Sequence, residues 1–546
     1  MTGFSTPSRR ADIAPVLVAI LWVAYIAALP FHRVWVLPWL GLKLQPPELV
    51  LVLLIATSST LWWHGRVRWR ISLTDAAAAA WIAANLLALA WSTEPRSREG
   101  LIETAGAASL VALYIAVRLT ATPTLLDRFG AWFGYSAAAA AALGVAGSVA
   151  SYAGYPNRLA TVALTPVPYL GSAPRAQAFT AGPGMLASIL VVAIPLFVAS
   201  RMKRGWRRRD AALVVLLLIG LGLTFSKTAV CLVSALAVMW ASARPTSDRQ
   251  RSWRSRQRVC IAGAVSLLAA FVFAVGSHVI VLREAAVPNM IAAQLIAGSP
   301  LASFRWRGVA WVVMPTTYLF NKQASLRAIG YSWPAGLGPA GQEMFTAGLQ
   351  REGRFPSTVI LITPHSTYLK PVSELGAAGL AALLLILFAG GTTIRRLLVS
   401  PAVPRWEAAA CAGIGAAFLI EAMSTDLLNC RHYWLMLAVM AARLDTHMLG
   451  LHHDCREQIP VPSHGGYVAV EEGERPDQSA GYPRERTEPR MARKIEHSKP
   501  ARDEEDRRFG HDREAGPLEH LPQRAARVGL LEAIGIQPEG LERRRE

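Results

Sequence analysis

The sequence predicts an all-α polytopic membrane protein with about twelve transmembrane helices, one large extracytoplasmic loop and a disordered cytoplasmic tail. Of its 546 residues 53% are apolar, although the formal net charge is +19. Apolar runs near twenty residues long recur from Ala11 to Asp445, and each is long enough to cross the roughly 30 Å hydrocarbon layer of a bilayer. Because that layer offers no water to backbone groups, the runs must be helical.

We place the spans near residues 11–30, 46–63, 72–91, 101–119, 131–151, 182–200, 211–225, 228–242, 260–281, 368–390, 407–423 and 433–447. Arg9 and Arg10 precede the first run, as they would in a signal peptide. Nothing after that run reads as a soluble secreted domain, so we expect a retained first span.

Basic residues are concentrated in alternate short loops, and loops of this kind stay in the cytoplasm. The clusters lie near residues 66–70, 201–209, 244–258 and 395–405. Both termini are therefore expected in the cytoplasm. The same placement between hydrophobic spans argues against nucleic acid as the partner of the positive charge.

The apolar run from Ala211 to Ser242 is too long for one ordinary span, and both of its ends are strongly basic. We expect a hairpin of two short helices with Ser226 and Lys227 at the far apex, facing outward. The alternative is a transmembrane helix whose lysine extends its ammonium group to the membrane surface.

Residues 1–449 form the predicted membrane domain, and residues 282–366 form its one large periplasmic loop. Loops of this length are usually functional or disordered. The apolar stretches Val309–Val313 and Tyr318–Phe320 argue against disorder, so we expect short helices lying on the membrane surface. Residues 450–546 are rich in Arg, Glu, Asp and Pro and are expected to be largely disordered, although 525–536 could form a short helix.

Titratable and basic residues converge on the predicted outer face. They are Arg175, Lys227 at the hairpin apex, Arg305 and Arg307 in the large loop, and His365 at its end. Cations gathered at a membrane face suit a diphosphate, because its oxygens accept charge-assisted hydrogen bonds. The alternative for each arginine is a membrane anchor, and for the histidine a structural role. The five cysteines show neither metal-ligand nor disulfide spacing.

The segment around His365 carries the most specific pattern. His365 and Ser366 are followed by nine residues, Gly376, two further residues and Gly379, with Leu369 and Glu374 between. This pattern resembles the ligase members of the O-antigen ligase and polymerase superfamily of bacterial inner-membrane proteins. Glu374 either orients a basic residue or caps the start of the following helix.

Further motifs in the same order strengthen the resemblance, which covers residues 175–380. Residues 224–229, around Ser226 and Lys227, resemble the family's Ser-Arg apex, with lysine in place of arginine. Residues 336–339 resemble its Gly-x-Gly turn, and Arg175 with the turn after it resembles an arginine at the corresponding span. Either Arg305 or Arg307 corresponds to the loop arginine; Trp311 follows Arg307 at helical spacing.

The resemblance implies a membrane glycosyltransferase of the bacterial inner membrane that acts at the periplasmic face. It would transfer a glycan from undecaprenyl diphosphate to an acceptor hydroxyl. The reaction would need no cofactor or metal and would invert the anomeric carbon. His365 would be the general base, and Arg175, Lys227 and Arg305 or Arg307 would bind the diphosphate. Asp426, in the last external turn, is a weaker candidate.

Several functions stay open within the superfamily. A ligase joins the polymer to lipid A core in lipopolysaccharide biosynthesis, a polymerase joins polysaccharide repeat units, and a third type modifies protein hydroxyls. From a different class, a transporter or lipid flippase could also have about twelve spans. Transporters usually place polar groups near the membrane midplane, whereas the distinctive residues here gather at one face.

Overall fold

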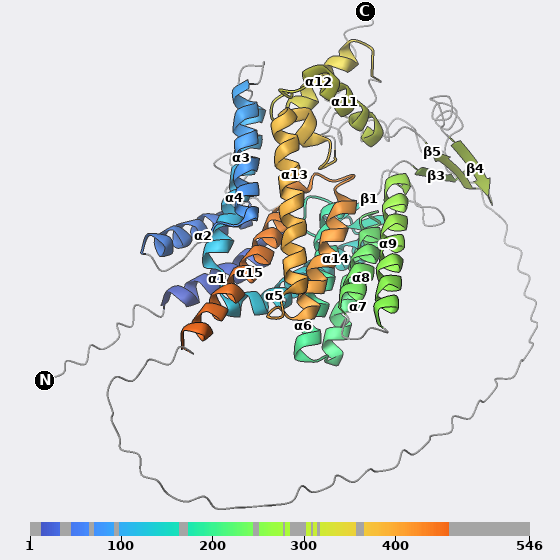
Figure 1. Ribbon diagram of the computed structural model, residues 1–546. Helices are drawn as coiled ribbons and strands as arrows, with labels where there is room; N and C mark the ends of the chain where they lie inside the picture. Colours follow the sequence, from blue (N-terminus) through green and yellow to red (C-terminus); the bar gives the residue numbers. More distant parts are fainter. Residues whose placement is uncertain are drawn as a thin grey trace, which may run out of the picture. The chain divides into compact units, whose positions relative to one another are not determined.

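The computed structural model describes residues 13–32, 45–64, 70–91, 98–162, 173–243, 251–276, 279–283, 302–306, 309–313, 317–355 and 365–457. The strands between residues 279 and 313 are described by their backbone alone. Figure 1 shows a predominantly helical protein.

Each of the twelve predicted spans coincides with a helix. These helices are α1 (Ile13–Ala28), α2 (Pro46–Trp63), α3 (Leu73–Trp91), α4 (Arg98–Thr120), α5 (Pro123–Tyr152), α6 (Pro183–Arg204), α7 (Arg208–Leu223), α8 (Ala229–Ser242), α9 (Arg251–Gly276), α13 (Lys370–Val399), α14 (Arg405–Glu421) and α15 (Arg431–Glu457). Within the described residues, seven of them are long and apolar enough to cross a membrane: α2, α3, α4, α5, α6, α9 and α13.

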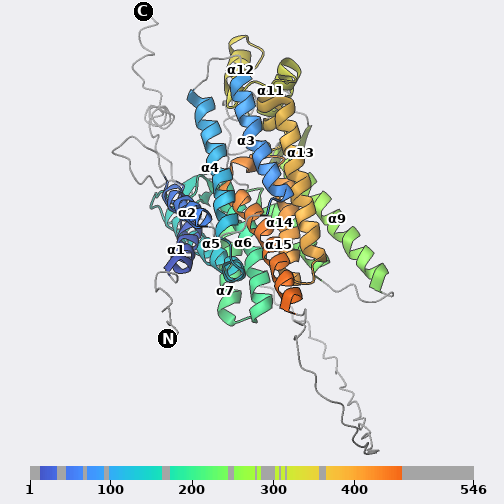
Figure 2. The same ribbon diagram turned by 60° about the vertical axis from the view of Figure 1, so that its left-hand side comes forward.

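The centre of the helical bundle is α6. Every residue from Leu186 to Phe197 is buried, and a helix that is apolar on all sides belongs in such a position. It contacts α5, α7, α8 and α14, and Figures 1 and 2 both show α5, α7 and α14 near it.

Small residues set the spacing between neighbouring helices. A Cβ atom on Gly413 of α14 would come within 3.0 Å of the backbone of Ala235 in α8. A Cβ atom on Gly220 of α7 would come equally close to the side chain of Ala141 in α5. Helix pairs in membranes commonly pack through small residues in this way, because the backbones can approach closely.

The helix break at the hairpin falls at the predicted residues. Helix α7 ends at Leu223 and α8 begins at Ala229, so Ser226 and Lys227 lie in the turn between them. Helix α15 extends ten residues past the predicted end at 447, to Glu457. The sequence contains no proline in this stretch until Pro460, and proline is the residue that would end the helix. The predicted tail beyond residue 457, including 525–536, lies outside the described residues.

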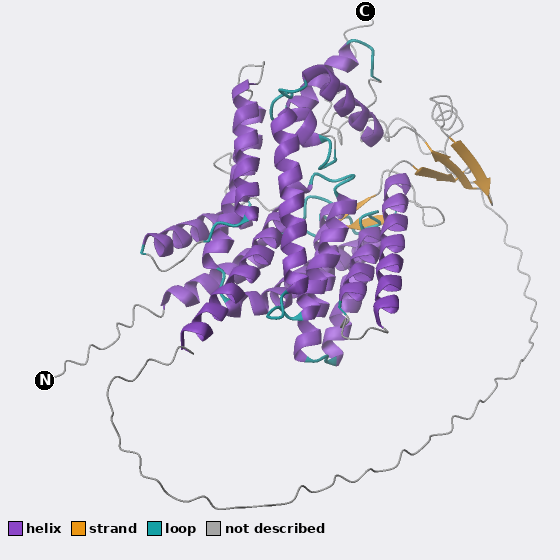
Figure 3. Cartoon of the chain, in the orientation of Figure 1, coloured by secondary structure: helices purple, strands orange, loops and turns teal. Residues whose placement is uncertain are grey.

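The large loop contains both helices and strands. Helices α11 (Thr317–Ser332) and α12 (Gly341–Arg351) agree with the short helices predicted there. The stretch Val309–Val313 is instead strand β5, the centre of an antiparallel sheet with β3 (Val279–Arg283) and β4 (Ala302–Trp306). A second sheet pairs β1 (Ala160–Val162) with β2 (Pro174–Ala176). Figure 3 marks the strands in orange.

The described residues are nearly all helical, in agreement with the predicted all-α membrane-protein class, and these strands of three to five residues are small additions to it. The predicted span to residue 281 is wrong at its end, because α9 stops at Gly276 and Val279 already belongs to β3. Segment β5 reads Val-Ala-Trp-Val-Val, and β-branched and aromatic side chains pack well in a strand. The helical spacing expected between Arg307 and Trp311 is therefore wrong, since Trp311 lies in a strand.

Candidate active site

His365 lies five residues before α13 in an unusual backbone conformation. Its φ angle is 45°, in the left-handed region that few residues other than glycine adopt, although histidine is enriched among those that do. Its side chain is half-buried. Backbone strain of this kind is concentrated at functional sites.

The two residues after His365 attach this segment to the turn between α14 and α15. The Thr367 amide donates hydrogen bonds to the carbonyls of Ala422 and Thr425, at 2.9 and 3.1 Å. The Thr367 hydroxyl donates to the Thr425 carbonyl at 2.7 Å and accepts from the Leu427 amide at 2.9 Å. Ser366 Oγ lies 3.4 Å from the Ala422 carbonyl. The position of the imidazole is therefore set by two segments about sixty residues apart in sequence.

Four charged groups act on the imidazole of His365: Lys227, Lys322, Lys370 and Asp426. Burial lowers the pKa of His365 below its usual 6.5, the Asp426 carboxylate opposes this shift, and the three lysines reinforce it. A histidine in these surroundings is mostly neutral at pH 7, as a general base must be.

Lys227 lies at the apex between α7 and α8, where the sequence predicts it. Its Nζ is 4.9 Å from the centre of the Phe273 ring of α9, a cation–π distance. Burial and the nearby Lys322 ammonium lower the pKa of Lys227 to about 8. Lys227 and Lys322 are thus close enough for their charges to interact.

Arg175 also reaches this apex. It lies in β2, paired with Thr161 of β1, and its Nε donates a 2.9 Å hydrogen bond to the carbonyl of Thr224 at the end of α7. The start of α6 lies near the same turn, since a Cβ atom on Gly184 would lie 3.9 Å from Ser226 Oγ. Arg175 therefore supports the turn that carries Lys227.

Lys322 and Lys370 are site residues that the sequence analysis missed. Lys322 of α11 donates a 3.2 Å hydrogen bond to Ser424 Oγ, in the α14–α15 turn to which Thr367 is hydrogen-bonded. Burial lowers the pKa of Lys322. In the sequence nothing distinguishes Lys322 from Arg327 of the same helix. Lys370 is different, because it is the first residue of α13. The helix dipole disfavours a cation at that position, so a lysine there indicates that other groups stabilise its charge.

That reason is an ion-pair cluster beside His365. Lys370 Nζ lies 2.9 Å from Asp426 Oδ2 and also pairs with Glu103 of α4. Asn429 donates a hydrogen bond to each of these two carboxylates, at 2.8 Å. The charge of Lys370 is thereby balanced.

Glu374 belongs to the same cluster. It is 2% exposed, and its charge acts on Lys370. Of the two roles predicted for it, capping of the helix start is wrong, because α13 begins at Lys370 and has no acidic residue in its first turn. The electrostatic contact with Lys370 agrees with the other role, the orientation of a basic residue.

The glycines of the motif hold two backbone segments together. Gly376 interrupts α13 with a φ of 62°, and Gly336 has a φ of 83°. A Cβ atom on either would come within 3.0 Å of the backbone of the other segment. Three hydrogen bonds join the segments: Leu337 N to Ser373 O, Gly338 N to Glu374 O, and Ala377 N to Pro334 O, at 3.0, 2.8 and 2.8 Å. The turn at 336–338 thus packs directly on the start of α13.

Of the two loop arginines, Arg305 lies in β4 opposite Ala310 of β5, with only its backbone described. Arg307 lies outside the described residues. The loop cation with a described contact to the site is therefore Lys322. An imidazole, two lysines that interact with each other and an arginine behind them can hold an anion and accept a proton beside it.

No model of a known protein family matches the sequence, and no curated protein sequence matches it either.

Proposed function

We propose that this chain is a membrane glycosyltransferase that transfers a glycan from undecaprenyl diphosphate to an acceptor hydroxyl. In this proposal the twelve helices span the bacterial inner membrane with both termini in the cytoplasm, and His365 faces the periplasm. The acceptor is lipid A core, as in the O-antigen ligases that the His365 motif resembles.

The observation that carries the proposal is the charge around His365. The two lysines Lys227 and Lys322 come from separate elements, α7–α8 and α11, and both act on the imidazole. Like charges repel, so gathering them costs free energy that a bound dianion or trianion would offset. A diphosphate has the matching charge and several acceptor oxygens.

The reaction follows from this arrangement. The acceptor oxygen attacks the anomeric carbon while the bond from that carbon to the diphosphate oxygen breaks, and the electron pair of this bond leaves with the diphosphate. Lys227 and Lys322 stabilise the added negative charge. His365, neutral at pH 7, takes the proton of the acceptor hydroxyl. Attack from the side opposite the leaving group inverts the anomeric carbon.

Substitution of the base tests the proposal. His365→Ala is expected to abolish transfer by the purified full-length protein, measured with undecaprenyl diphosphate-linked glycan and, in turn, lipid A core, a glycan repeat unit and a protein acceptor. The control is His64→Ala, at an exposed histidine at the end of α2. Retained transfer in the His365 variant would refute the assignment, and the acceptor that reacts distinguishes ligase, polymerase and protein-modifying types.

A further inference from the structure

Ser188 is the one polar side chain in the buried stretch of α6 from Leu186 to Phe197. Its hydroxyl donates a 3.0 Å hydrogen bond to Oε2 of Glu421, the last residue of α14. The same hydroxyl lies 2.8 Å from Nε2 of His432, the second residue of α15. All three residues are only 1% exposed, so they form a polar cluster inside the helical bundle.

The hydrogen bonds of this cluster assign its protons. The Ser188 hydroxyl has one proton to donate, and Glu421 accepts it. Nε2 of His432 therefore carries the proton of the second hydrogen bond and donates it to Ser188 Oγ. The ion pairs among the described residues do not include Glu421. Burial of a carboxyl group without a paired cation costs free energy, so its presence calls for a function.

A second catalytic centre of the serine–histidine–acid kind does not fit this cluster. In such a centre the imidazole lies between the hydroxyl and the carboxylate, where it can take the proton of the hydroxyl. Here the hydroxyl lies between the imidazole and the carboxylate. The cluster is also buried, so its hydroxyl is not presented to a substrate.

The cluster closes the base of the α14–α15 turn, residues 422–430. Glu421 directly precedes this turn and His432 lies two residues after its end, so the hydroxyl of Ser188 connects its two ends. Buried polar groups whose hydrogen bonds are made are rigid and specify one arrangement. The turn is thereby fixed to α6, the central helix of the bundle.

This turn carries the contacts that place His365 and Lys322. Thr367, two residues after His365, donates its amide hydrogen to the carbonyl of Ala422 at 2.9 Å. Lys322 donates a 3.2 Å hydrogen bond to Ser424 in the same turn. A displacement at the base of the turn would therefore be passed to the imidazole.

We propose that Ser188, Glu421 and His432 are positioning residues, which fix the α14–α15 turn and thereby hold His365 at the acceptor hydroxyl. This assignment rests on the proposed function. The three residues act through the carbonyl of Ala422, the residue after Glu421, and not by contact with substrate. Accurate placement matters for the rate, because a misplacement of about 1 Å can lower it roughly a hundredfold.

Hydrogen–deuterium exchange tests the placement without requiring catalysis. The full-length protein is labelled in nanodiscs, and exchange is mapped on peptides by mass spectrometry. Ser188→Ala removes the bridging hydroxyl and is expected to speed exchange several-fold at residues 366–370 and 422–430. Ser148→Ala is the matched control, since Ser148 of α5 is equally buried and its hydroxyl has no hydrogen-bond partner among the described residues. It should exchange as the unsubstituted protein does.

Transfer kinetics provide the second measurement. Ser188→Ala is expected to lower kcat about tenfold. KM for the donor should change less, because Lys227 is held at a separate apex between α7 and α8. Glu421→Gln keeps a side-chain oxygen that can accept the hydrogen bond from Ser188, so this variant should retain slow exchange and most of kcat.

The outcomes separate the positioning role from the catalytic proposal. Unchanged exchange in Ser188→Ala, or equal acceleration in Ser148→Ala, would overturn the positioning role. A Glu421→Gln variant as impaired as Ser188→Ala would overturn it too. Faster exchange around His365 in Ser188→Ala, in a protein whose unsubstituted form transfers no glycan, would leave the attachment of the turn standing and refute the transferase activity.

Discussion

At the scale of single residues, the pH response of the site depends on two groups whose pKa values are both lowered. In the proposed mechanism, transfer requires His365 neutral and Lys227 protonated. Burial lowers the pKa of His365 below 6.5, so the rate should rise as pH increases through that lowered value. The pKa of Lys227 is about 8, so the rate should fall above pH 8 as the ammonium loses its proton. The window of activity lies between these limits.

Replacement of Lys227 by arginine should change one side of this profile alone. A guanidinium stays charged throughout the accessible range, so Lys227→Arg is expected to move the alkaline fall in kcat/KM to higher pH, as far as the remaining lysine, Lys322, allows. The acid side, set by His365, should not move. A purely structural role of Lys227 would lower the whole profile evenly, and that result in a pH-rate measurement would contradict the assignment.

Lys322 is predicted to contribute directly to donor binding. Hydrogen bonds to charged groups contribute about 1.5–3 kcal/mol, so Lys322→Met should lower kcat/KM by about tenfold to a hundredfold. The control is Arg327→Met on the same helix, where the exposed guanidinium lies 5.1 Å from the centre of the Phe355 ring. Equal losses in the two variants would show that the effect comes from the packing of α11.

Sequence reasoning could find the residues that local motifs mark. His365 has its glycine spacing, Lys227 sits at the break of an overlong apolar run, and Arg175 precedes a glycine turn. Lys322 has no such mark, because its place beside Lys227 is set by the long-range contact of α11 with Ser424. The role of Lys370 depends likewise on Glu103, which lies 267 residues earlier in the chain.

At the scale of elements, the joint between the 336–338 turn and the start of α13 should be intolerant of any side chain. Gly376→Ala would place a Cβ atom on a backbone with φ 62° and ψ −142°, a conformation that is close to the glycine-only region and costs other residues about 1–3 kcal/mol, and it would add a backbone clash with the Pro334–Gly336 segment. We expect a lower thermal unfolding midpoint in detergent and loss of transfer, since Lys370 and Glu374 lie in the same first turns of the helix.

Gly348→Ala is the control for this joint. Gly348 is in the interior of α12, and a Cβ atom there meets nothing within 4 Å. Because alanine is the better helix former by about 1 kcal/mol, this variant should unfold at the same temperature or slightly higher. If Gly376→Ala behaved in the same way, the close approach of the two segments would be wrong.

Helices were easier to predict than strands for a physical reason. An apolar run near twenty residues long can satisfy its backbone in a membrane only as a helix, so each run identifies its own structure. Strand β5 pairs with β3, and their partners Val281 and Trp311 are thirty residues apart. Such pairing depends on distant segments, and the expectation of surface helices in the loop gave no reason to consider it.

At the scale of the whole molecule, ion pairs join helices at several points of the bundle. Arg118 of α4 pairs with Asp75 of α3 and Asp445 of α15, at 3.0 and 2.6 Å. Arg431 of α15 pairs with Glu48 of α2 at 2.7 Å. Charges in helices of this apolarity are costly unless paired, so each pair specifies which helices are neighbours.

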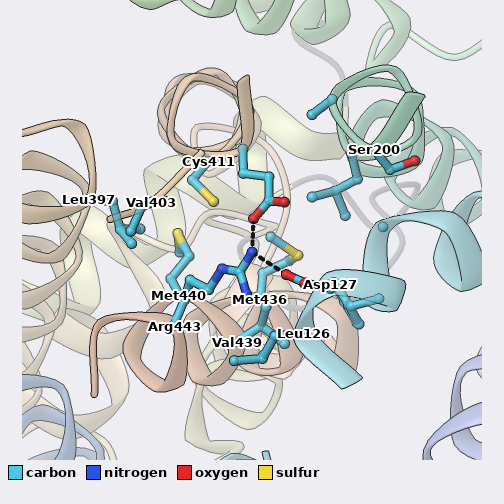
Figure 4. Close-up of a pocket in the computed structure, with 15 residues that line it drawn as sticks. Leu126, Asp127, Ser200, Leu397, Val403, Cys411, Met436, Val439, Met440 and Arg443 are labelled. Atoms are coloured by element: carbon cyan, nitrogen blue, oxygen red, sulfur yellow. Dashed lines mark hydrogen bonds and ion pairs between the residues drawn. The ribbon is translucent and has the colours of Figure 1, made fainter. Parts of the chain in front are cut away.

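Among the described residues, the pair group with the most ion pairs lies at a small cavity of about 50 Å³, which Asp127, Glu407 and Arg443 help to line (Figure 4). Arg443 of α15 contacts Asp127 of α5 at 2.6 Å and also Glu407 of α14. Lys203 of α6 lies 3.2 Å from Asp127 and 3.6 Å from Glu407. Two cations and two carboxylates thereby join four helices, and Arg443 is the most buried of the four, with 8% of its side chain exposed.

Removal of Arg443 is predicted to loosen the bundle without altering the chemistry. Breaking a fully buried pair costs about 3–5 kcal/mol, but Asp127 and Glu407 are 40% and 21% exposed and regain water, so about 1–3 kcal/mol is expected for Arg443→Met. Thermal unfolding in detergent should show a lower midpoint, whereas Arg354→Met, whose exposed partner is Glu352, should show none. Arg431 begins α15 next to the turn to which the segment after His365 is attached. Arg443 lies twelve residues further along this helix, about 18 Å away, so KM for the donor should stay unchanged below the unfolding temperature. A raised KM would mean that the two ends of α15 are coupled.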